Sequence, residues 1–124
     1  MGGRDAPDHQ FFRLPTSIPV RGVEVRSDDW EELVFDGRLL DISGSGVLLR
    51  TDLELMSGDR ACLRFNLGTE SFSLVVEVQS VLRQREGGAF HLGSKFIDLS
   101  RHEQDRLVRA INAEQVSLLE RGLL

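Results

Sequence analysis

The chain has 124 residues, 40% of them hydrophobic and 28% charged, with a formal net charge of −5 at pH 7. These values fit one globular domain with a single core, and the acidic balance argues against a nucleic-acid-binding protein, which usually carries a basic stripe. A single cysteine excludes an intrachain disulfide, and the lack of a signal-peptide pattern or a long apolar run predicts a cytoplasmic protein without membrane insertion.

Residues 1–15 are predicted to form a flexible N-terminal arm, because glycine, proline and polar residues dominate there without an apolar pattern. Phe11 and Phe12 lie near the end of this arm and favour burial. We therefore expect them to hold the arm against the domain and to determine where Arg13 points.

Residues 16–99 are predicted to form a β-barrel, because apolar and polar residues alternate there in short runs separated by turn residues. In the first run, Val23 and Val25 are out of phase with the apolar positions that precede Gly22. A slip of one residue exchanges the two faces of a strand, so this pattern predicts a β-bulge at Gly22.

The following runs give clearer strands. Asp36-Gly37 predicts a turn or bulge within the second run. The strongest alternation places two sets of apolar residues on one face each: Ala61, Leu63, Phe65 and Leu67, then Phe72, Leu74, Val76 and Val78. The second of these strands is expected to continue to Arg83, before a hairpin at Gly87-Gly88.

The period changes at Ser100, where a capping pattern and apolar residues at helical spacing predict a helix over residues 100–124. Leu107 and Ile111 are expected to face the barrel, and Gly122 is expected to end the helix. The whole pattern predicts a mainly β fold, a small antiparallel six-stranded (split) β-barrel with one C-terminal α-helix, in a single domain covering residues 1–124.

Catalytic and metal sites are not apparent in the sequence. His9, His91 and His102 lack the spacing of metal ligands. Neither Ser43 nor Ser45 is preceded by the glycine that a nucleophile elbow requires. We therefore predict that the protein is not an enzyme and holds no metal or cofactor.

The segment Asp41–Gly46 separates two apolar runs and contains one aspartate, two serines and two glycines. Short oxygen-bearing side chains can bind a polar ligand, and glycine allows a close approach of the backbone. The same composition is also typical of an ordinary hairpin turn. The segment alone leaves both interpretations open.

A resemblance to a known family favours the binding site. Asp41, Ser43 and Gly46 match the motif Asp/Asn-x-Ser-x-x-Gly, and Arg13 matches the second arginine of Arg-x-x-x-Arg, with His9 in the place of the first. The surrounding order agrees at Phe11–Pro15, Gly58-Asp59 and Leu92–Phe96. The chain thereby resembles a PilZ domain, a receptor module for cyclic di-GMP, and is most similar to the PilZ half of flagellar-brake proteins.

The resemblance implies which residues bind cyclic di-GMP. They are His9, Arg13, Asp41, Ser43 and Gly46, with Arg4, Gly44 and Gly93 as further candidates. In the family, the arginines of the arm wrap the ligand while the aspartate and serine of the barrel contact guanine. Arginine suits this role because its guanidinium forms bidentate hydrogen bonds with phosphate and with the guanine edge.

Three functions remain to be compared. The first is a cyclic di-GMP receptor that reorganises its N-terminal arm and signals to an unidentified protein effector in motility, biofilm or exopolysaccharide control, as a monomer or weak homodimer. The second is a degenerate PilZ adaptor that binds no nucleotide and works through protein contacts, which His9 favours. The third is a barrel for single-stranded nucleic acid, but the acidic balance and the lack of tyrosine argue against a DNA or RNA partner.

Overall fold

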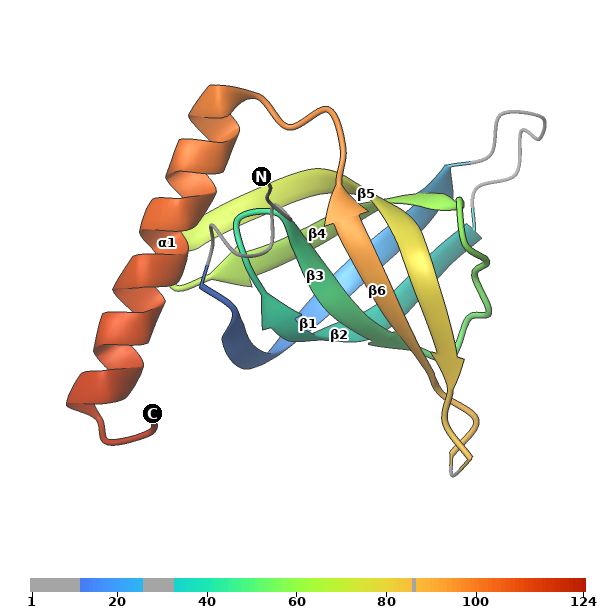
Figure 1. The fold of residues 1–124 in the computed structure, drawn as a ribbon, viewed down its shortest axis with the longest axis horizontal. Helices are drawn as coiled ribbons and strands as arrows, with labels where there is room; N and C mark the ends of the chain where they lie inside the picture. The colour runs from blue at the N-terminus through green and yellow to red at the C-terminus, as the bar shows by residue number, and fades with distance from the viewer. Residues whose placement is uncertain (1–11, 26–32, 86) are drawn as a thin grey trace, which may run out of the picture.

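The computed structural model describes residues 12–25, 33–85 and 87–124. It contains six strands followed by one helix (Figure 1). Their bounds are β1 Leu14–Val25, β2 Leu33–Ile42, β3 Gly46–Thr51, β4 Arg60–Leu67, β5 Glu70–Arg83, β6 Phe90–Phe96 and α1 Arg101–Glu120.

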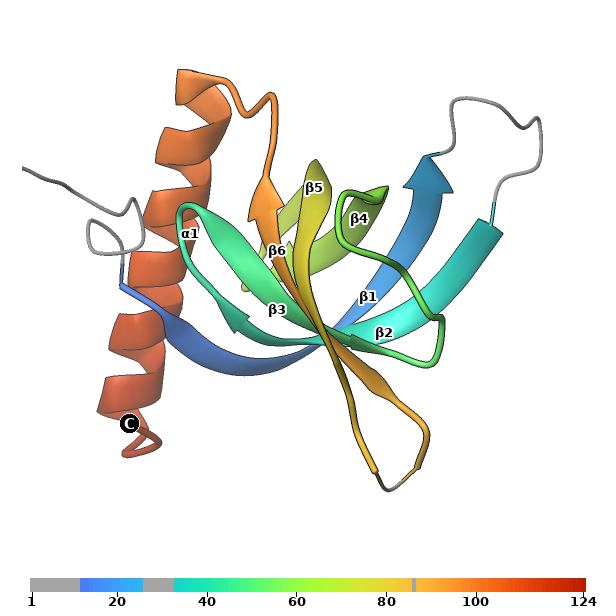
Figure 2. The ribbon, with the colours of Figure 1, turned by 45° about the vertical axis from the view of Figure 1, so that its right-hand side comes forward.

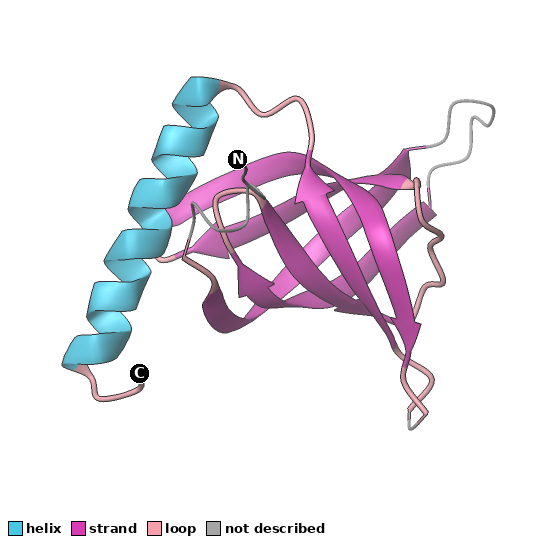
Figure 3. Cartoon of the chain, viewed as in Figure 1, coloured by secondary structure: helices cyan, strands magenta, loops and turns pink. Residues whose placement is uncertain are grey.

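The strands form a closed antiparallel barrel in the order β1-β2-β3-β6-β5-β4, with β4 paired to β1. Figures 2 and 3 show the strands curving around a common centre, with α1 outside the barrel at one end. The predicted fold, a six-stranded antiparallel barrel with one C-terminal helix, is therefore confirmed.

The core consists of side chains that face inward at alternate positions along the strands. In β4 the residues at 61, 63, 65 and 67 are at most 4% exposed, and those at 72, 74, 76 and 78 in β5 are at most 5% exposed. β5 also continues to Arg83, as expected. The alternation in these two strands predicted the facing of each side chain correctly because both strands pair without a break over this length.

The predicted bulge at Gly22 is wrong. Pairing between β1 and β2 is continuous from Ile18 to Glu24, and the irregularity lies earlier, between Pro15 and Ile18. A Cβ on Gly22 would lie 2.2 Å from Cζ of Phe35, so the glycine faces inward and makes room for that ring. Glu24 takes the next inward position at 4% exposure, which turns the neighbouring valines outward.

The predicted interruption at Asp36-Gly37 is also wrong, since both residues lie within β2. A Cβ on Gly37 would lie 2.5 Å from the carbonyl oxygen of Arg50. The glycine therefore marks a close approach of β2 and β3. The register shift of this pair comes later, between Leu39 and Asp41.

Helix α1 covers the end of the barrel beside the β2–β3 turn, whereas the β5–β6 hairpin projects from the other end (Figure 1). Ser100 caps its first turn by accepting a hydrogen bond from the amide of Glu103 at 3.1 Å. Leu107 and Ile111 are 0% and 2% exposed, as predicted. Gly122, with φ of 71°, donates to the carbonyl of the residue three positions earlier and ends the helix.

A side chain of α1 also binds the start of β5. Arg106 donates to the carbonyl oxygen of Ser71 at 2.9 Å, and its guanidinium lies 4.1 Å from the centre of the Phe72 ring. These contacts hold the helix against the barrel. Within the described part of the chain, no helix combines the length and apolar character needed to cross a membrane.

Candidate functional site

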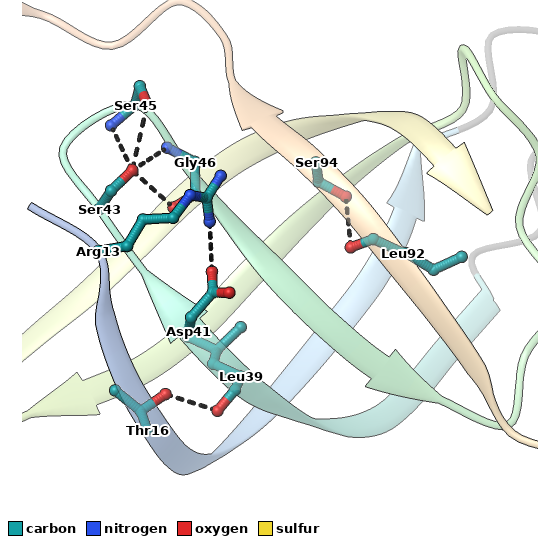
Figure 4. Close-up of polar contacts among 9 residues, drawn as sticks. All are labelled: Arg13, Thr16, Leu39, Asp41, Ser43, Ser45, Gly46, Leu92 and Ser94. Carbon is teal, nitrogen blue, oxygen red and sulfur yellow. Dashed lines mark hydrogen bonds and ion pairs between the residues drawn. The ribbon is translucent and has the colours of Figure 1, made fainter. Parts of the chain in front are cut away.

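The turn between β2 and β3 is built around the hydroxyl of Ser43. This side chain is fully buried, and its Oγ accepts hydrogen bonds from the amides of Ser45 and Gly46, both at 3.2 Å. Figure 4 shows these contacts of the Ser43 hydroxyl. The amide of Ser43 donates to the carbonyl oxygen of Gly46 at 2.9 Å. Ser43 therefore shapes the turn from inside, and its side chain is absent from the exposed surface.

Arg13 and Asp41 form an ion pair on the surface next to this turn (Figure 4). Nη1 of Arg13 lies 2.5 Å from Oδ1 of Asp41, with the two side chains 44% and 24% exposed. The pairing of Leu14 with Ile42 at the start of β1 carries the arginine to the aspartate. Two residues that lie 28 positions apart in the chain thus meet at one accessible point.

The predicted glycines of the site have packing roles in the barrel. A Cβ on Gly46 would lie 2.3 Å from the carbonyl oxygen of Ser94, so glycine allows β3 to approach β6 closely. A Cβ on Gly93 would lie 2.5 Å from Oγ of Ser80. Contact of either glycine with a ligand stays a prediction.

Helix α1 and strand β6 hold the turn from behind. Nε2 of Gln104 donates to the carbonyl oxygen of Gly44 at 3.1 Å, and the amide of Phe96 donates to the carbonyl oxygen of Ser45 at 2.9 Å. Gly44 is buried by these elements. The backbone of the turn is thus fixed from two sides, which leaves the Arg13–Asp41 pair as the part of the site that is open to solvent.

The strand register extends the surface beyond this pair. Asp41 lies opposite Leu48 of β3, and Leu48 lies opposite Gly93 of β6. All three are partly exposed. Gly93 therefore belongs to the same row across the barrel as Asp41, two strands away.

Some candidates could not be placed, and one contributor was missed. His9 and Arg4 lie outside the described residues, as does Phe11, and Phe12 is 47% exposed, which is more than the expected anchoring of the arm would require. Gln104 was missed because its role depends on the docking of α1. The helical pattern of the sequence does not indicate which polar side chain of the helix contacts the turn.

The Arg13–Asp41 pair also determines the chemistry of this surface. The Arg13–Asp41 pair offers a cation with several donors beside a carboxylate with several acceptors, which together suit a ligand that carries both phosphate and base edges. In the described ranges, no three His, Cys, Asp or Glu side chains gather as a metal site would require.

Comparison with known proteins places this geometry in a family. The model of the PilZ domain family matches residues 7–113 of the chain. A search of curated proteins finds no match. Among solved structures, the PilZ domain of YcgR from Escherichia coli with c-di-GMP has a TM-score of 0.70 and 20% identity, and the match covers 91% of this chain and 95% of that one.

Two further similar structures belong to larger chains. The inhibitor of motility MotI/DgrA of Bacillus subtilis matches with a TM-score of 0.66 and 16% identity, covering 87% of this chain and 51% of that one. MrkH of K. pneumonia in complex with c-di-GMP matches with a TM-score of 0.60 and 20% identity, covering 90% and 52%. The present chain thus spans about half of each.

At these identities the similar structures support the fold alone. MrkH is also described as a c-di-GMP-dependent transcription regulatory factor. The expected lack of a nucleic-acid partner therefore rests on the charge of the chain and stays a prediction.

Proposed function

The chain belongs to the PilZ domain family, and from that premise we propose that it is a cyclic di-GMP receptor whose N-terminal arm reorganises on binding and signals to a protein effector. The observation that carries this proposal is the ion pair between Arg13 and Asp41. The two side chains come from the two motifs of the family and meet on an accessible surface.

The pair suggests how binding changes the protein. In the free protein, each side chain satisfies the charge of the other. Guanine N–H groups can replace Arg13 as the partner of Asp41, and phosphate or the guanine O6/N7 edge can replace Asp41 as the partner of Arg13. A partly exposed ion pair contributes only about 0–1 kcal/mol, so a ligand can displace it at small cost. The backbone before β1 then follows Arg13 to a new position.

Calorimetric titration with cyclic di-GMP tests the proposal. Arg13→Ala and Asp41→Ala should each weaken binding by at least about tenfold, because each removes a charge-assisted contact worth about 1.5–3 kcal/mol. Arg85→Ala is the matched control, since Arg85 is exposed and lies on the distant β5–β6 hairpin. Its affinity should equal that of the wild type.

A charge exchange separates binding from stability. The double variant Arg13→Asp/Asp41→Arg keeps an ion pair at this point but reverses its direction. We expect near-wild-type thermal stability together with loss of binding. Equal affinity of the wild type, both alanine variants and the exchange variant would show that the site lies elsewhere.

The second candidate is an adaptor that binds no nucleotide. The presence of His9 in place of the first arginine favours it, because neutral imidazole offers one donor where guanidinium offers five. An adaptor of this kind would give no binding heat with cyclic di-GMP for the wild type, at any pH between about 6 and about 8.

A further inference from the structure

Four arginines form a diagonal row across the outer face of the barrel. In the strand register, Arg50 of β3 lies opposite Arg38 of β2, and Arg21 of β1 lies opposite Arg64 of β4. Arg38 lies opposite Pro19, two residues before Arg21 in β1, so the two pairs are diagonal neighbours. All four side chains are exposed. We call this row, with the hollow that it lines, the arginine groove.

The arginines receive few contacts from the barrel itself. Arg38 donates to the carbonyl oxygen of Ser17 at 3.0 Å. Like charges directly opposite each other on neighbouring strands destabilise a sheet, and the groove contains two such pairs. Arg21 pairs with Asp36 at 3.3 Å, but the two side chains are 67% and 79% exposed, which makes the pair weak. Arg50 and Arg64 have no hydrogen-bond or ion-pair partner among the residues that the structure describes.

The surface at this position is hollow and locally basic. An open groove of about 910 Å³ is lined by the four arginines together with Asp36 and Asp52. Four arginines against two aspartates oppose the overall charge of −5. This local excess suits an anionic partner, which would supply the charges that the domain itself does not provide.

We propose that the arginine groove binds an extended acidic segment of a protein partner. Directly opposite residues are about 5 Å apart and diagonal ones about 7–8 Å, which makes the row about 17 Å long. An extended segment of about five residues covers this length, and its alternate side chains are about 6.6 Å apart. Carboxylates at alternate positions therefore fall within reach of successive guanidinium groups and can bind them in the bidentate manner.

The remaining surface features favour a peptide over a nucleic acid. Single-stranded nucleic acid uses exposed aromatic rings on which its bases stack. The rings beneath the groove, Phe65 and Phe72, are 4% and 3% exposed and stack on each other with centroids 5.5 Å apart. Both sides of every barrel strand are already paired, so the segment would bind through its side chains and not as an added strand.

Fluorescence anisotropy with a defined peptide tests this proposal. The probe is a fluorescein-labelled peptide with glutamate at alternate positions, and its control carries glutamine at the same positions. We expect the glutamate peptide to bind the full chain at low salt, to weaken as salt screens the charges, and to bind at least about tenfold more tightly than the glutamine peptide.

Charge reversal identifies the groove as the binding surface. Arg64→Glu should weaken the peptide by at least about tenfold, whereas Arg85→Glu, which changes the net charge equally on the β5–β6 hairpin, should change it by less than about twofold. Arg64→Glu also replaces a like-charge pair with an opposite-charge pair beside Arg21. Its melting temperature should stay level or rise, so lost binding would not reflect unfolding.

Several results would overturn the proposal. The first is no binding of the glutamate peptide, and the second is equal weakening of that peptide by Arg64→Glu and Arg85→Glu. The third is that a short oligothymidylate binds more tightly than the glutamate peptide and that Arg64→Glu abolishes this binding. The groove lies on other residues than the Arg13–Asp41 pair, so cyclic di-GMP affinity should be the same in Arg64→Glu and in the wild type. Loss of that affinity in Arg64→Glu would instead make the groove part of the nucleotide site.

Discussion

At the scale of single residues, Ser43 and Asp41 share a motif but differ in what they do for the free protein. Ser43 is buried and holds two backbone amides of the turn, whereas Asp41 is partly exposed and has one ion-pair partner. The motif therefore combines a structural serine with an accessible aspartate. Loss of ligand binding has a different meaning at each position.

Ser43→Ala should lower the free energy of unfolding by about 1–3 kcal/mol, because it removes the acceptor of one buried and one partly buried amide. Asp41→Ala should change it by no more than about 1 kcal/mol, because a partly exposed ion pair contributes little. Urea unfolding followed by circular dichroism measures both. Similar values for the two variants would contradict the structural role of Ser43.

His9 lies outside the described residues, and its prediction follows from the sequence. An ordinary imidazole is mostly neutral at pH about 8 and gains a proton as the pH falls towards about 6. If His9 replaces the first arginine of the motif, ligand phosphates favour its protonated form, so affinity for cyclic di-GMP should rise as the pH falls. His9→Arg should bind more tightly at pH about 8 and lose this dependence.

Calorimetry of the wild type and His9→Arg at both pH values, with matched ionic strength, provides the measurement. The wild type and variant should converge at the lower pH. A wild-type affinity that is constant with pH, together with no gain from His9→Arg, would show that His9 does not face the ligand.

At the scale of elements, α1 divides into a buried first part and a more exposed second part. Leu107 and Ile111 are almost fully buried against the barrel, whereas Val116 and Leu119 are 52% and 53% exposed. The apolar surface continues past the helix at Leu123, which is 62% exposed.

Deletion of residues 116–124 should therefore leave a folded barrel. We expect a lower melting temperature, because the partly buried Leu118 also contacts the core, and weaker self-association of a kind that sedimentation can detect. Retained strand signal in circular dichroism would agree with this division. Unfolding of the truncated chain would contradict it.

The strands show which parts of the fold could be predicted from the sequence alone. β4 and β5 were predicted residue by residue because their inward positions are apolar without exception. β1 and β2 were misread where an inward position holds glycine or glutamate. Gly22 lies against the Phe35 ring and Gly37 against a β3 carbonyl, so each marks close packing. That packing depends on a neighbouring strand which the local sequence does not contain.

At the scale of the whole molecule, both proposed binding surfaces depend on strand order. The alternation of apolar residues did not predict that Arg13 lies near Asp41. The family resemblance assigned both residues to one ligand site, and the pairing at the start of β1 brings them into contact. The arginine groove was not predicted at all. Its residues lie on four strands, and the order β3-β2-β1-β4 alone makes them neighbours.

The net charge of the chain gave no indication of this groove. A net charge of −5 describes the whole chain, whereas the folded barrel gathers four arginines on one part of its outer face. The distribution of charge over the folded surface, rather than its sum, therefore determines which partners the domain can attract.

Closure of the barrel also has a consequence for the chain during synthesis. β1 needs β4 on one side, and β3 needs β6 on the other. A nascent chain that ends before Arg60 can form only an open sheet of β1, β2 and β3, in which both outer strands have unpaired backbone groups. Such edges are where strands of other chains can add. These edges are fully paired only when β6 is available, because β6 joins β3 to β5 and closes the barrel.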